Sequence, residues 1–276
     1  MKKDTLKIAL KYMILLLTSV LMLFPLFWMI STSLKSGPEV FKIPLQWIPE
    51  NLLWENFTAL FSKYNAGIYL KNTIILCILN VAGSLISCSL VAYGLTFIEF
   101  KHKNIMLMLM LMTMMVPGAV TFFPQFLVYV KLGWYGTNLP LWFPAFTANA
   151  YFVILLRQYF LSIPKPIIDA AKISGCGHFK MMTKIVLPLA KPVLIMIAIS
   201  AFTFAWTDLF GPLVYLLNEN DKTWSLLLTY LNNSWSNESS LPKIMAAGLI
   251  SMIPTLIIYF LAQKEMIKSF VFKKEE

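Results

Sequence analysis

Six long apolar segments constrain the fold of this chain more than any other feature. Each is long enough to cross the hydrocarbon core of a bilayer, which takes about 20 residues of helix. Because lipid offers no hydrogen-bond partners to an open backbone, such segments are expected to be helices and not strands. The sequence therefore predicts an all-α membrane protein with six transmembrane helices. They are expected at residues 10–32, 69–97, 105–130, 141–160, 192–217 and 244–262.

The composition agrees with this class of protein. Apolar residues make up 58% of the chain, charged residues only 13%, and the mean hydropathy is +0.71. An ordinary soluble domain is therefore excluded. The first segment is expected to remain a span and not to be a cleaved signal peptide. Its apolar stretch is longer than a secretory core, and no small-x-small cleavage pattern follows before Lys35.

The distribution of basic residues predicts which ends of the spans face the cytoplasm. A net charge of +10 would by itself also suit a nucleic-acid partner. However, 16 of the 23 Lys and Arg residues lie in residues 1–11, 98–104, 157–191 and 264–276. The positive-inside rule places these four segments in the cytoplasm. We therefore expect both termini to be cytoplasmic, and we expect no nucleic-acid partner.

Seven residues in the longest of these cytoplasmic segments form a spaced pattern. They are Asp169, Ala170, Ala171, Gly175, Ile185, Leu187 and Pro188. The pattern resembles the EAA signature of the permease subunits of ATP-binding-cassette importers, with every spacing kept and Asp169 in place of the usual Glu. The resemblance implies that residues 158–190 form a cytoplasmic coupling loop that docks on a separate ATPase.

The same residues indicate a docking element on physical grounds. Pro166 suits the first turn of a short helix, and Gly175 offers a stop about nine residues later. A helix this short is marginal alone in water and needs a partner surface. Ala170 and Ala171 leave little bulk on the helix, so it fits closely into a cleft. Asp169 is expected in the first turn, where the helix dipole favours a negative charge.

Polar residues inside the apolar segments mark a candidate translocation path. Asp208 is the best candidate for the path or a gate, because a carboxylate in lipid is costly unless it faces a polar interior or the membrane boundary. A structural salt bridge or a boundary position is the alternative. Asp208 follows Trp206 in a stretch that resembles the W-N-D/E element of importer permeases. Asn72 and Asn80 either line the path or join helices by hydrogen bonds.

Residues 34–68 form the longest predicted extracytoplasmic loop. Its aromatic residues are Trp47, Trp54, Phe57 and Tyr64. Such rings suit the boundary between membrane and water, and contact with an external solute-binding protein is the alternative. Residues 264–276 are predicted to be a cytoplasmic tail. This tail follows Gln263 and lacks the glycine-containing ending of the importer permeases.

The sequence carries no pattern of an enzyme or a metal site. It has no G-x4-G-K-[S/T] phosphate loop, no H-E-x-x-H, no G-x-S-x-G and no C-x-x-C. Cys77, Cys88 and Cys176 are odd in number, so neither a disulfide framework nor a metal cluster is implied. We expect no catalytic residue, metal or cofactor in this chain. ATP and Mg²⁺ are expected to be bound by the partner ATPase.

Nearly the whole chain resembles the shorter permease of a two-permease pair in carbohydrate importers of the maltose-transporter type. The resemblance implies one transmembrane permease domain over residues 1–276, with the type I importer fold, in a bacterial inner membrane. It implies three partners, namely a second permease, a dimeric ATPase on the cytoplasmic side and an extracytoplasmic solute-binding protein. An oligosaccharide path would be polar with aromatic faces. The aromatic residues available for it include Tyr129, Trp142, Tyr151 and Trp206.

Other functions remain open from the sequence. The EAA-like pattern is specific for importer permeases in general, so the cargo is alternatively glycerol phosphate, a polyamine or an amino acid. A protein of a different class, an ion-driven secondary transporter or channel, would take up solute without ATP. A membrane receptor or scaffold would leave the partner ATPase rate unchanged when ligand-loaded binding protein is added.

Overall fold

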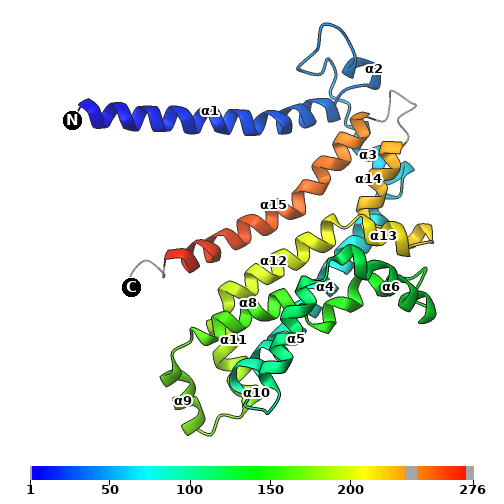
Figure 1. The fold of residues 1–276 in the computed structure, drawn as a ribbon. Helices are drawn as coiled ribbons and strands as arrows, with labels where there is room; N and C mark the ends of the chain where they lie inside the picture. The colour runs from blue at the N-terminus through cyan, green and yellow to red at the C-terminus, as the bar shows by residue number, and fades with distance from the viewer. Residues whose placement is uncertain (1, 234–240, 272–276) are drawn as a thin grey trace. The chain divides into compact units, whose positions relative to one another are not determined.

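The computed structural model describes the backbone of residues 2–233 and 241–271 and the side chains of residues 7–232 and 241–263. Every regular element in these ranges is a helix (Figure 1). The first part of the chain forms α1 (Lys2–Ser33), α2 (Gly37–Val40), α3 (Glu55–Lys63), α4 (Ala66–Phe97), α5 (Lys103–Met115) and α6 (Gly118–Lys131). The second part forms α7 (Leu139–Trp142), η1 (Phe143–Thr147), α8 (Ala150–Leu161), α9 (Lys165–Ile173), α10 (His178–Met181), η2 (Met182–Val186), α11 (Leu187–Leu189), α12 (Lys191–Thr207), α13 (Phe210–Tyr215), η3 (Glu219–Asp221), α14 (Trp224–Asn233) and α15 (Leu241–Val271).

Four stretches of the described chain are long and apolar enough to cross a membrane. They are Lys7–Ser33, Ala66–Phe97, Leu139–Leu161 and Leu241–Gln263. Two bent helix pairs raise the number of spans to six if each pair is counted as one. The predicted all-α membrane fold is confirmed. Of the predicted tail at residues 264–276, the last five residues and all the side chains lie outside the described part.

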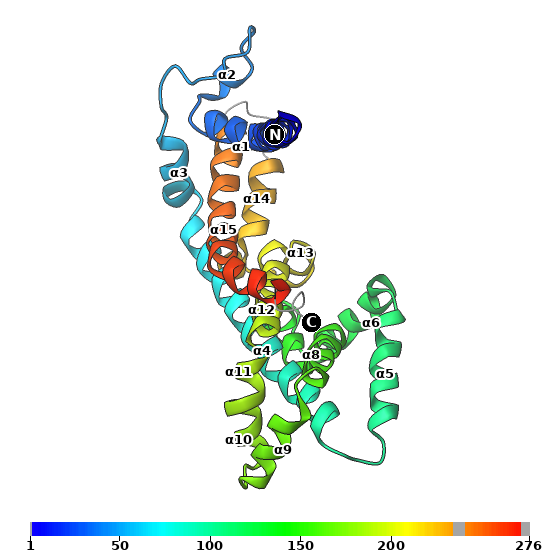
Figure 2. The same cartoon turned by 90° about the vertical axis from the view of Figure 1, so that its left-hand side faces the viewer.

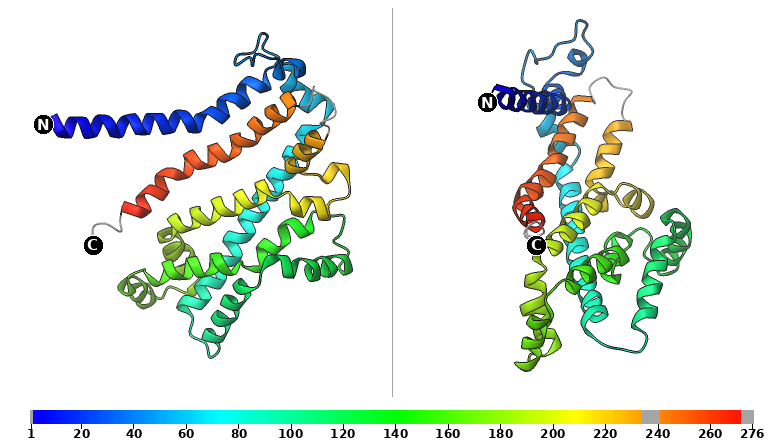
Figure 3. Two further views of the ribbon diagram at one scale, coloured as in Figure 1. Left: turned by 45° about the horizontal axis from the view of Figure 1, so that its top comes forward. Right: turned by 60° about the vertical axis from the view of Figure 1, so that its left-hand side comes forward.

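The first bent pair consists of α5 and α6, which meet at an angle of 102° (Figure 3). The break falls at Val116 and Pro117, which both have an extended backbone. Proline favours this conformation in the residue before it, and a helix therefore ends there. Pro117 therefore accounts for the break between the two helices. Pro124, by contrast, lies inside α6 and does not interrupt it.

The second bent pair joins His178–Leu189 to α12 at an angle of 82°. Helix α12 ends at Thr207, so the segment predicted at 192–217 is too long for one helix. The reason is that Asp208 has an extended backbone with ψ 116°, after which the chain continues as the short helix α13. Hydropathy did not detect this break, because the residues on both sides of it are apolar.

The chain forms two compact units. The first contains Met1–Gly67 and Leu227–Pro254, and the second contains Ile68–Leu226 and Thr255–Glu276. Helices α4, α14 and α15 each contribute residues to both units. The predicted division into one permease domain with an outer loop, a cytoplasmic loop and a tail stays a prediction.

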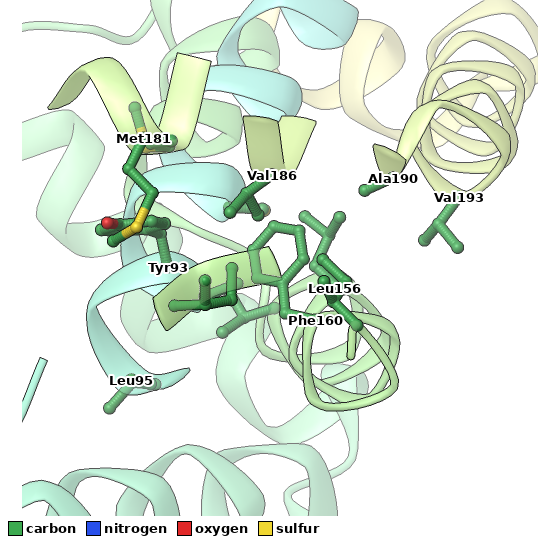
Figure 4. Packing of buried hydrophobic residues seen from close by; sticks show 14 of the residues in the cluster. Tyr93, Leu95, Leu156, Phe160, Met181, Val186, Ala190 and Val193 are labelled. Carbon is green, nitrogen blue, oxygen red and sulfur yellow. The ribbon is translucent and has the colours of Figure 1, made fainter. Parts of the chain in front are cut away.

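The second unit contains a continuous apolar cluster (Figure 4). It joins the end of α4 to α8, to the 158–190 loop and to the start of α12. Its fully or almost fully buried members include Ala92, Tyr93, Leu156, Phe160, Met181, Val186, Ala190 and Ile197. Interiors of this kind are close-packed and transmit displacement from one element to the next. The cluster therefore fixes the position of the 158–190 loop on the span helices.

Candidate docking loop and membrane cavity

Helix α9 carries the first three residues of the EAA-like pattern, and it lies with α10 at one end of the second unit (Figure 2). Ile168 and Ala171, three positions apart, share one face of the helix and are buried in the apolar cluster. Asp169 and Ala170 are exposed. The buried pair therefore fixes α9, and the carboxylate and the small Ala170 are presented to a partner.

Asp169 does not lie in the first turn of α9, where the sequence analysis placed it. The helix begins at Lys165, and its first turn has no acidic residue. Pro166 lies in that first turn as expected, but Pro164 is already the N-cap residue. Asp169 is therefore one turn further along, where the helix dipole has little effect on its charge. Its charge faces outward and is available to a basic partner.

Gly175 ends α9 with a Schellman motif. Its φ of +71° is a left-handed conformation that favours glycine. The amide of Cys176 donates to the carbonyl of Ala171, and the amide of Gly175 donates to the carbonyl of Lys172, both at 3.0 Å. A Cβ on Gly175 would meet nothing within 4 Å. The helix stops where the sequence predicts, and the requirement for glycine is one of backbone conformation and not of space.

The second half of the pattern holds the loop in place. Ile185 and Leu187 are partly buried and pack against the apolar cluster. Pro188 is exposed and lies in the short helix α11. The turn at Met182–Val186 is a π-helix, a wider turn that is common at functional sites. These residues therefore position the loop, whereas Asp169 and Ala170 form part of its surface.

Large apolar side chains beside the pattern remain uncovered. Ile173 is 88% exposed and Phe179 is 75% exposed. Exposed basic residues, Lys172 and Lys180, flank them. An exposed apolar surface with a charged rim is typical of a protein contact. The 158–190 loop therefore has the chemistry of a docking element.

Polar contacts also join this loop to the span helices. The Tyr93 hydroxyl of α4 lies 3.1 Å from Nδ1 of His178, the first residue of α10. The Tyr159 hydroxyl of α8 donates to the carbonyl of Leu189 at 3.0 Å. Both bonds supplement the packing in the apolar cluster. The first bond therefore attaches the loop to α4, and the second, whose two residues both lie within 158–190, joins the end of α8 to α11.

A cavity of about 580 Å³ lies within the second unit, which is a size that suits a small ligand. It lies between α4, α6, α8, α12, α13 and the η1 region. Its polar lining consists of Asn80, Ser84, Gln125, Asn149, Ser200 and Asp208. Its aromatic lining consists of Phe122, Tyr129, Phe152, Phe204, Phe210 and Tyr215.

Asp208 is held in the cavity wall by the turn between α12 and α13. Its Oδ1 accepts a hydrogen bond from the amide of Gly211 at 3.0 Å, and its carbonyl accepts one from Ser225 Oγ at 2.6 Å. Space for the carboxylate depends on Gly211. A Cβ there would lie 2.5 Å from Asp208 Oδ2 and 2.9 Å from Leu141 Cδ2. None of the ion pairs among the described residues includes Asp208.

Asn80 lines the cavity and also holds an irregular part of the chain. Its Nδ2 donates to the carbonyl of Leu141 at 3.0 Å, and Ser87 Oγ donates to the carbonyl of Ala145 at 2.9 Å. These carbonyls belong to the α7 and η1 turns, where the helix is interrupted. Within a membrane such backbone groups must be satisfied by protein. Asn80 therefore joins helices by a hydrogen bond and also lines the cavity, and its role in a translocation path stays a prediction.

Two of the predicted path residues do not line this cavity. Asn72 Nδ2 donates to the carbonyls of Asn220 and Lys222 at 2.7 and 3.0 Å. Trp206 is buried and stacks on Phe202, with ring centroids 5.7 Å apart and an interplanar angle of 11°. The contacts of Asn72 fix the η3 loop, and those of Trp206 pack the end of α12.

Comparison with known proteins places the loop and the cavity in one family. Residues 85–269 match the family model described as the binding-protein-dependent transport system inner membrane component. This range includes the whole EAA-like pattern, Asp208 and most of the cavity lining. The chain belongs to this family. It is therefore a membrane component of a binding-protein-dependent transport system.

Curated permeases are similar to this family member over almost all of its length. The arabinooligosaccharides transport system permease protein AraQ of Bacillus subtilis is 30% identical over 270 residues, which cover 95% of this chain and 92% of AraQ. The probable ABC transporter permease protein YurM of the same organism is 30% identical over 253 residues, with 89% and 81% covered. The sn-glycerol-3-phosphate permease UgpE of Yersinia enterocolitica is 25% identical over 270 residues, with 94% of each chain covered.

Solved structures show the same fold. A chain of a bacterial ABC transporter involved in the import of the acidic polysaccharide alginate has a TM-score of 0.83 and 23% identity, with 96% of this chain and 98% of that chain covered. A chain of the bacterial alginate ABC transporter in complex with its alginate pentasaccharide-bound periplasmic protein has a TM-score of 0.66 and 17% identity, with 94% of each covered. The predicted importer-permease fold is confirmed.

Several cavity residues of this family member were not singled out by the sequence analysis. They are Ser84, Gln125, Asn149 and Ser200. Gln125 could have been selected from the sequence, because it is a polar residue in an apolar segment, as Asn80 is. Its Nε2 donates to the Tyr129 hydroxyl at 2.6 Å. Of the aromatic residues suggested for a sugar path, Tyr129 lines the cavity, whereas Trp142 and Tyr151 do not.

Proposed function

We propose that this chain is a permease subunit of an ATP-driven importer and that its cargo is a neutral oligosaccharide. The cavity of the second unit carries the cargo proposal. Its amide and hydroxyl side chains match the hydroxyl groups of a sugar, and its aromatic rings match the apolar C–H faces of a sugar ring. A mostly apolar site with a few placed polar groups is the usual form of a small-molecule site.

The charge of the lining argues against an anionic cargo. Asp208 is the only Asp or Glu among the lining residues, and these include no Lys or Arg. Phosphate and carboxylate groups are usually bound by Arg, Lys or open helix N-termini. At the N-termini of α8 and α13, which border the cavity, backbone N–H groups already donate hydrogen bonds to side-chain oxygens of the protein. Asn149 Oδ1 accepts from the amides of Tyr151 and Phe152, and Asp208 Oδ1 accepts from the amide of Gly211.

The names of the relatives indicate both neutral and anionic cargoes. AraQ is named for arabino-oligosaccharides, which are neutral, whereas UgpE is named for sn-glycerol 3-phosphate, which is an anion. This chain is 30% identical to AraQ and 25% identical to UgpE. The cavity chemistry supports a neutral cargo. A polyamine would also suit a lone carboxylate, and it is therefore included in the test below.

The proposed assembly has a second permease, an ATPase dimer on the cytoplasmic side and an extracytoplasmic solute-binding protein, in a bacterial inner membrane. ATP and Mg²⁺ would be bound by the ATPase subunits and not by this chain. The exposed Asp169, Ala170, Ile173 and Phe179 support an ATPase contact. The alginate transporter with its periplasmic protein supports a binding-protein contact by analogy. The basic residues support an orientation with the 158–190 loop and both termini in the cytoplasm.

The packing suggests how the ATPase would act on the cavity. When ATP closes the ATPase dimer, the docked 158–190 loop would move with it. The loop shares its apolar cluster with α4, α8 and α12, and all three helices also line the cavity. Packed elements move as units and not by continuous deformation. A displacement of the loop would therefore change the access of the cavity from one side of the membrane to the other.

Equilibrium binding to the purified complex tests the cargo. A neutral oligosaccharide, sn-glycerol 3-phosphate and spermidine would be compared on the wild type and on Asp208→Asn. We expect only the sugar to bind. The variant keeps the acceptor for Gly211 but replaces a charged hydrogen-bond acceptor by a neutral one, so it should bind sugar about fivefold to tenfold more weakly. Binding of the anion or the polyamine without sugar binding would contradict the proposal.

A further inference from the structure

The loop at residues 41–48, directly beyond α1 and α2, exposes most of its apolar side chains. The exposed members are Phe41, Ile43, Leu45, Trp47 and Ile48. Ile43 is 96% exposed and Ile48 is 75% exposed. A cluster of apolar side chains of this kind marks contact with a membrane or with another protein.

This 41–48 loop is firmly held to the end of α1. The Lys35 ammonium group donates to the carbonyl of Gln46, and Ser31 Oγ donates to the carbonyl of Trp47 at 2.5 Å. Lys35 itself is fully buried and lies over the Trp28 ring, with Nζ 4.9 Å from the ring centroid. The loop carbonyls nearest α1 are therefore satisfied within the protein. This is a requirement for backbone that approaches lipid.

The loop also folds back along the side of α1. The Trp47 ring lies 5.9 Å from the rings of both Phe24 and Trp28. At 1.5 Å per residue, these two positions are about 14 and 8 Å from the last residue of α1. A span of about 20 residues that follows Lys11 reaches the outer end of α1, so Trp28 lies near the outer boundary of the hydrocarbon. The loop therefore lies at the level of the membrane surface.

The polar side chains of the loop are gathered at one place. Lys42 Nζ and Gln46 Nε2 both donate to Glu50 Oε1, at 2.9 and 2.7 Å. The apolar side chains do not share these contacts. Separation of a polar edge from an apolar surface is typical of elements that lie in a membrane interface. Tryptophan is also enriched there.

We propose that the 41–48 loop is an anchor in the outer leaflet, with Ile43 and Ile48 inserted among the lipid headgroups and upper acyl chains. Lipid is the occupant because the loop continues the surface of α1. No residue is buried in the most apolar window of that helix. This proposal requires only that α1 crosses the membrane, so it stands or falls independently of the cargo.

Site-directed spin labelling of the full chain tests this anchor. The chain would be assembled with its partner subunits and reconstituted in liposomes. Ile43→Cys and Ile48→Cys would carry the nitroxide, and Asn51→Cys beside the polar edge is the matched control. The chain without an introduced cysteine measures labelling of the native thiols. Collisions with oxygen, which dissolves in lipid, and with an aqueous nickel chelate would be compared.

We expect nitroxides at residues 43 and 48 to collide with oxygen and to be protected from the chelate. The nitroxide at residue 51 should show the reverse. Two results would overturn the proposal. Equal access of the chelate to residues 43 and 51 would mean that the loop projects into water. Protection of residues 43 and 48 from both reagents would mean that another protein subunit covers the loop.

Discussion

The Tyr93 hydroxyl lies 3.1 Å from Nδ1 of His178 and joins a cavity-lining helix to the 158–190 loop. Tyr93 is buried, whereas His178 is exposed at the start of α10. Helix α4 also supplies Asn80 and Ser84 to the cavity lining. The hydrogen bond is therefore on a direct route between the proposed ATPase contact and the proposed solute path.

Tyr93→Phe removes this hydrogen bond and keeps the ring. A typical hydrogen bond contributes about 1 kcal/mol, so the complex should still assemble. We expect more ATP to be hydrolysed per solute transported, because the loop and α4 are less firmly joined. The measurement is the ratio of ATP hydrolysis to uptake in proteoliposomes. Tyr151→Phe, the same change at an exposed residue outside the loop, is the control.

The effects of changing Tyr93 and His178 should be non-additive. In a His178→Ala background, Tyr93→Phe should have no further effect on the ratio, because the bond is already absent. An unchanged ratio in Tyr93→Phe alone, or fully additive effects in the double variant, would show that the bond does not transmit movement.

Gly175→Ala should impair docking, although there is space for the added methyl group. A residue with a Cβ in the left-handed region costs roughly 1–2 kcal/mol. The Schellman motif should therefore loosen, and less ATPase should co-purify with the permease. Gly177→Ala is the matched control, since its φ is −63° and its Cβ also meets nothing within 4 Å. Equal loss of ATPase in both variants would contradict the conformational explanation.

Charge reversal at Asp169 should abolish stimulated transport and leave the fold intact. The side chain is exposed, so Asp169→Lys should change the unfolding midpoint little. Asp169→Glu restores the residue that is usual in the EAA signature and should retain transport, because the negative charge is kept. Uptake and the unfolding midpoint would be measured for both variants. Normal uptake by Asp169→Lys would exclude a role for this carboxylate in coupling.

Gly211→Ala should displace Asp208 in the cavity wall. The added Cβ would lie 2.5 Å from Asp208 Oδ2 and 2.9 Å from Leu141 Cδ2, so one or both must move. Overpacking of this kind costs about 1–3 kcal/mol. We expect weaker solute binding by calorimetry together with a lower unfolding midpoint. Gly67→Ala, where nothing lies within 4 Å, should change neither quantity.

The parts of the fold that depend on local sequence were predictable. The spans follow from hydropathy. The break at Pro117 follows from the restriction that proline places on the backbone of the preceding residue. The end of α9 at Gly175 follows from the ability of glycine to adopt the left-handed conformation. The end of α12 at Thr207 was missed. The extended Asp208 there is stabilised by hydrogen bonds from Ser225 Oγ and from the amide of Gly211. Ser225 lies 17 positions away in the sequence, so local patterns do not reveal this bond.

The cavity was only partly predictable for the same reason. Asp208 and Asn80 are conspicuous as polar residues in apolar segments, and both line it. Asn72 carries the same signal, yet its amide binds carbonyls 148 and 150 positions away along the chain. A polar residue in a predicted span therefore indicates that its side chain contacts another polar group or a cavity. Only the three-dimensional structure shows whether that partner is a backbone carbonyl or a cavity.

Uptake by the reconstituted complex shows whether this permease imports sugar at the expense of ATP. Proteoliposomes would contain this permease with its partner subunits, an excess of solute-binding protein outside, and either ATP with Mg²⁺ or no nucleotide inside. We predict uptake of a labelled neutral oligosaccharide only with ATP, and loss of that uptake with Asp169→Lys. Uptake that persists without ATP, or ATP-driven uptake of sn-glycerol 3-phosphate in place of the sugar, would contradict the account.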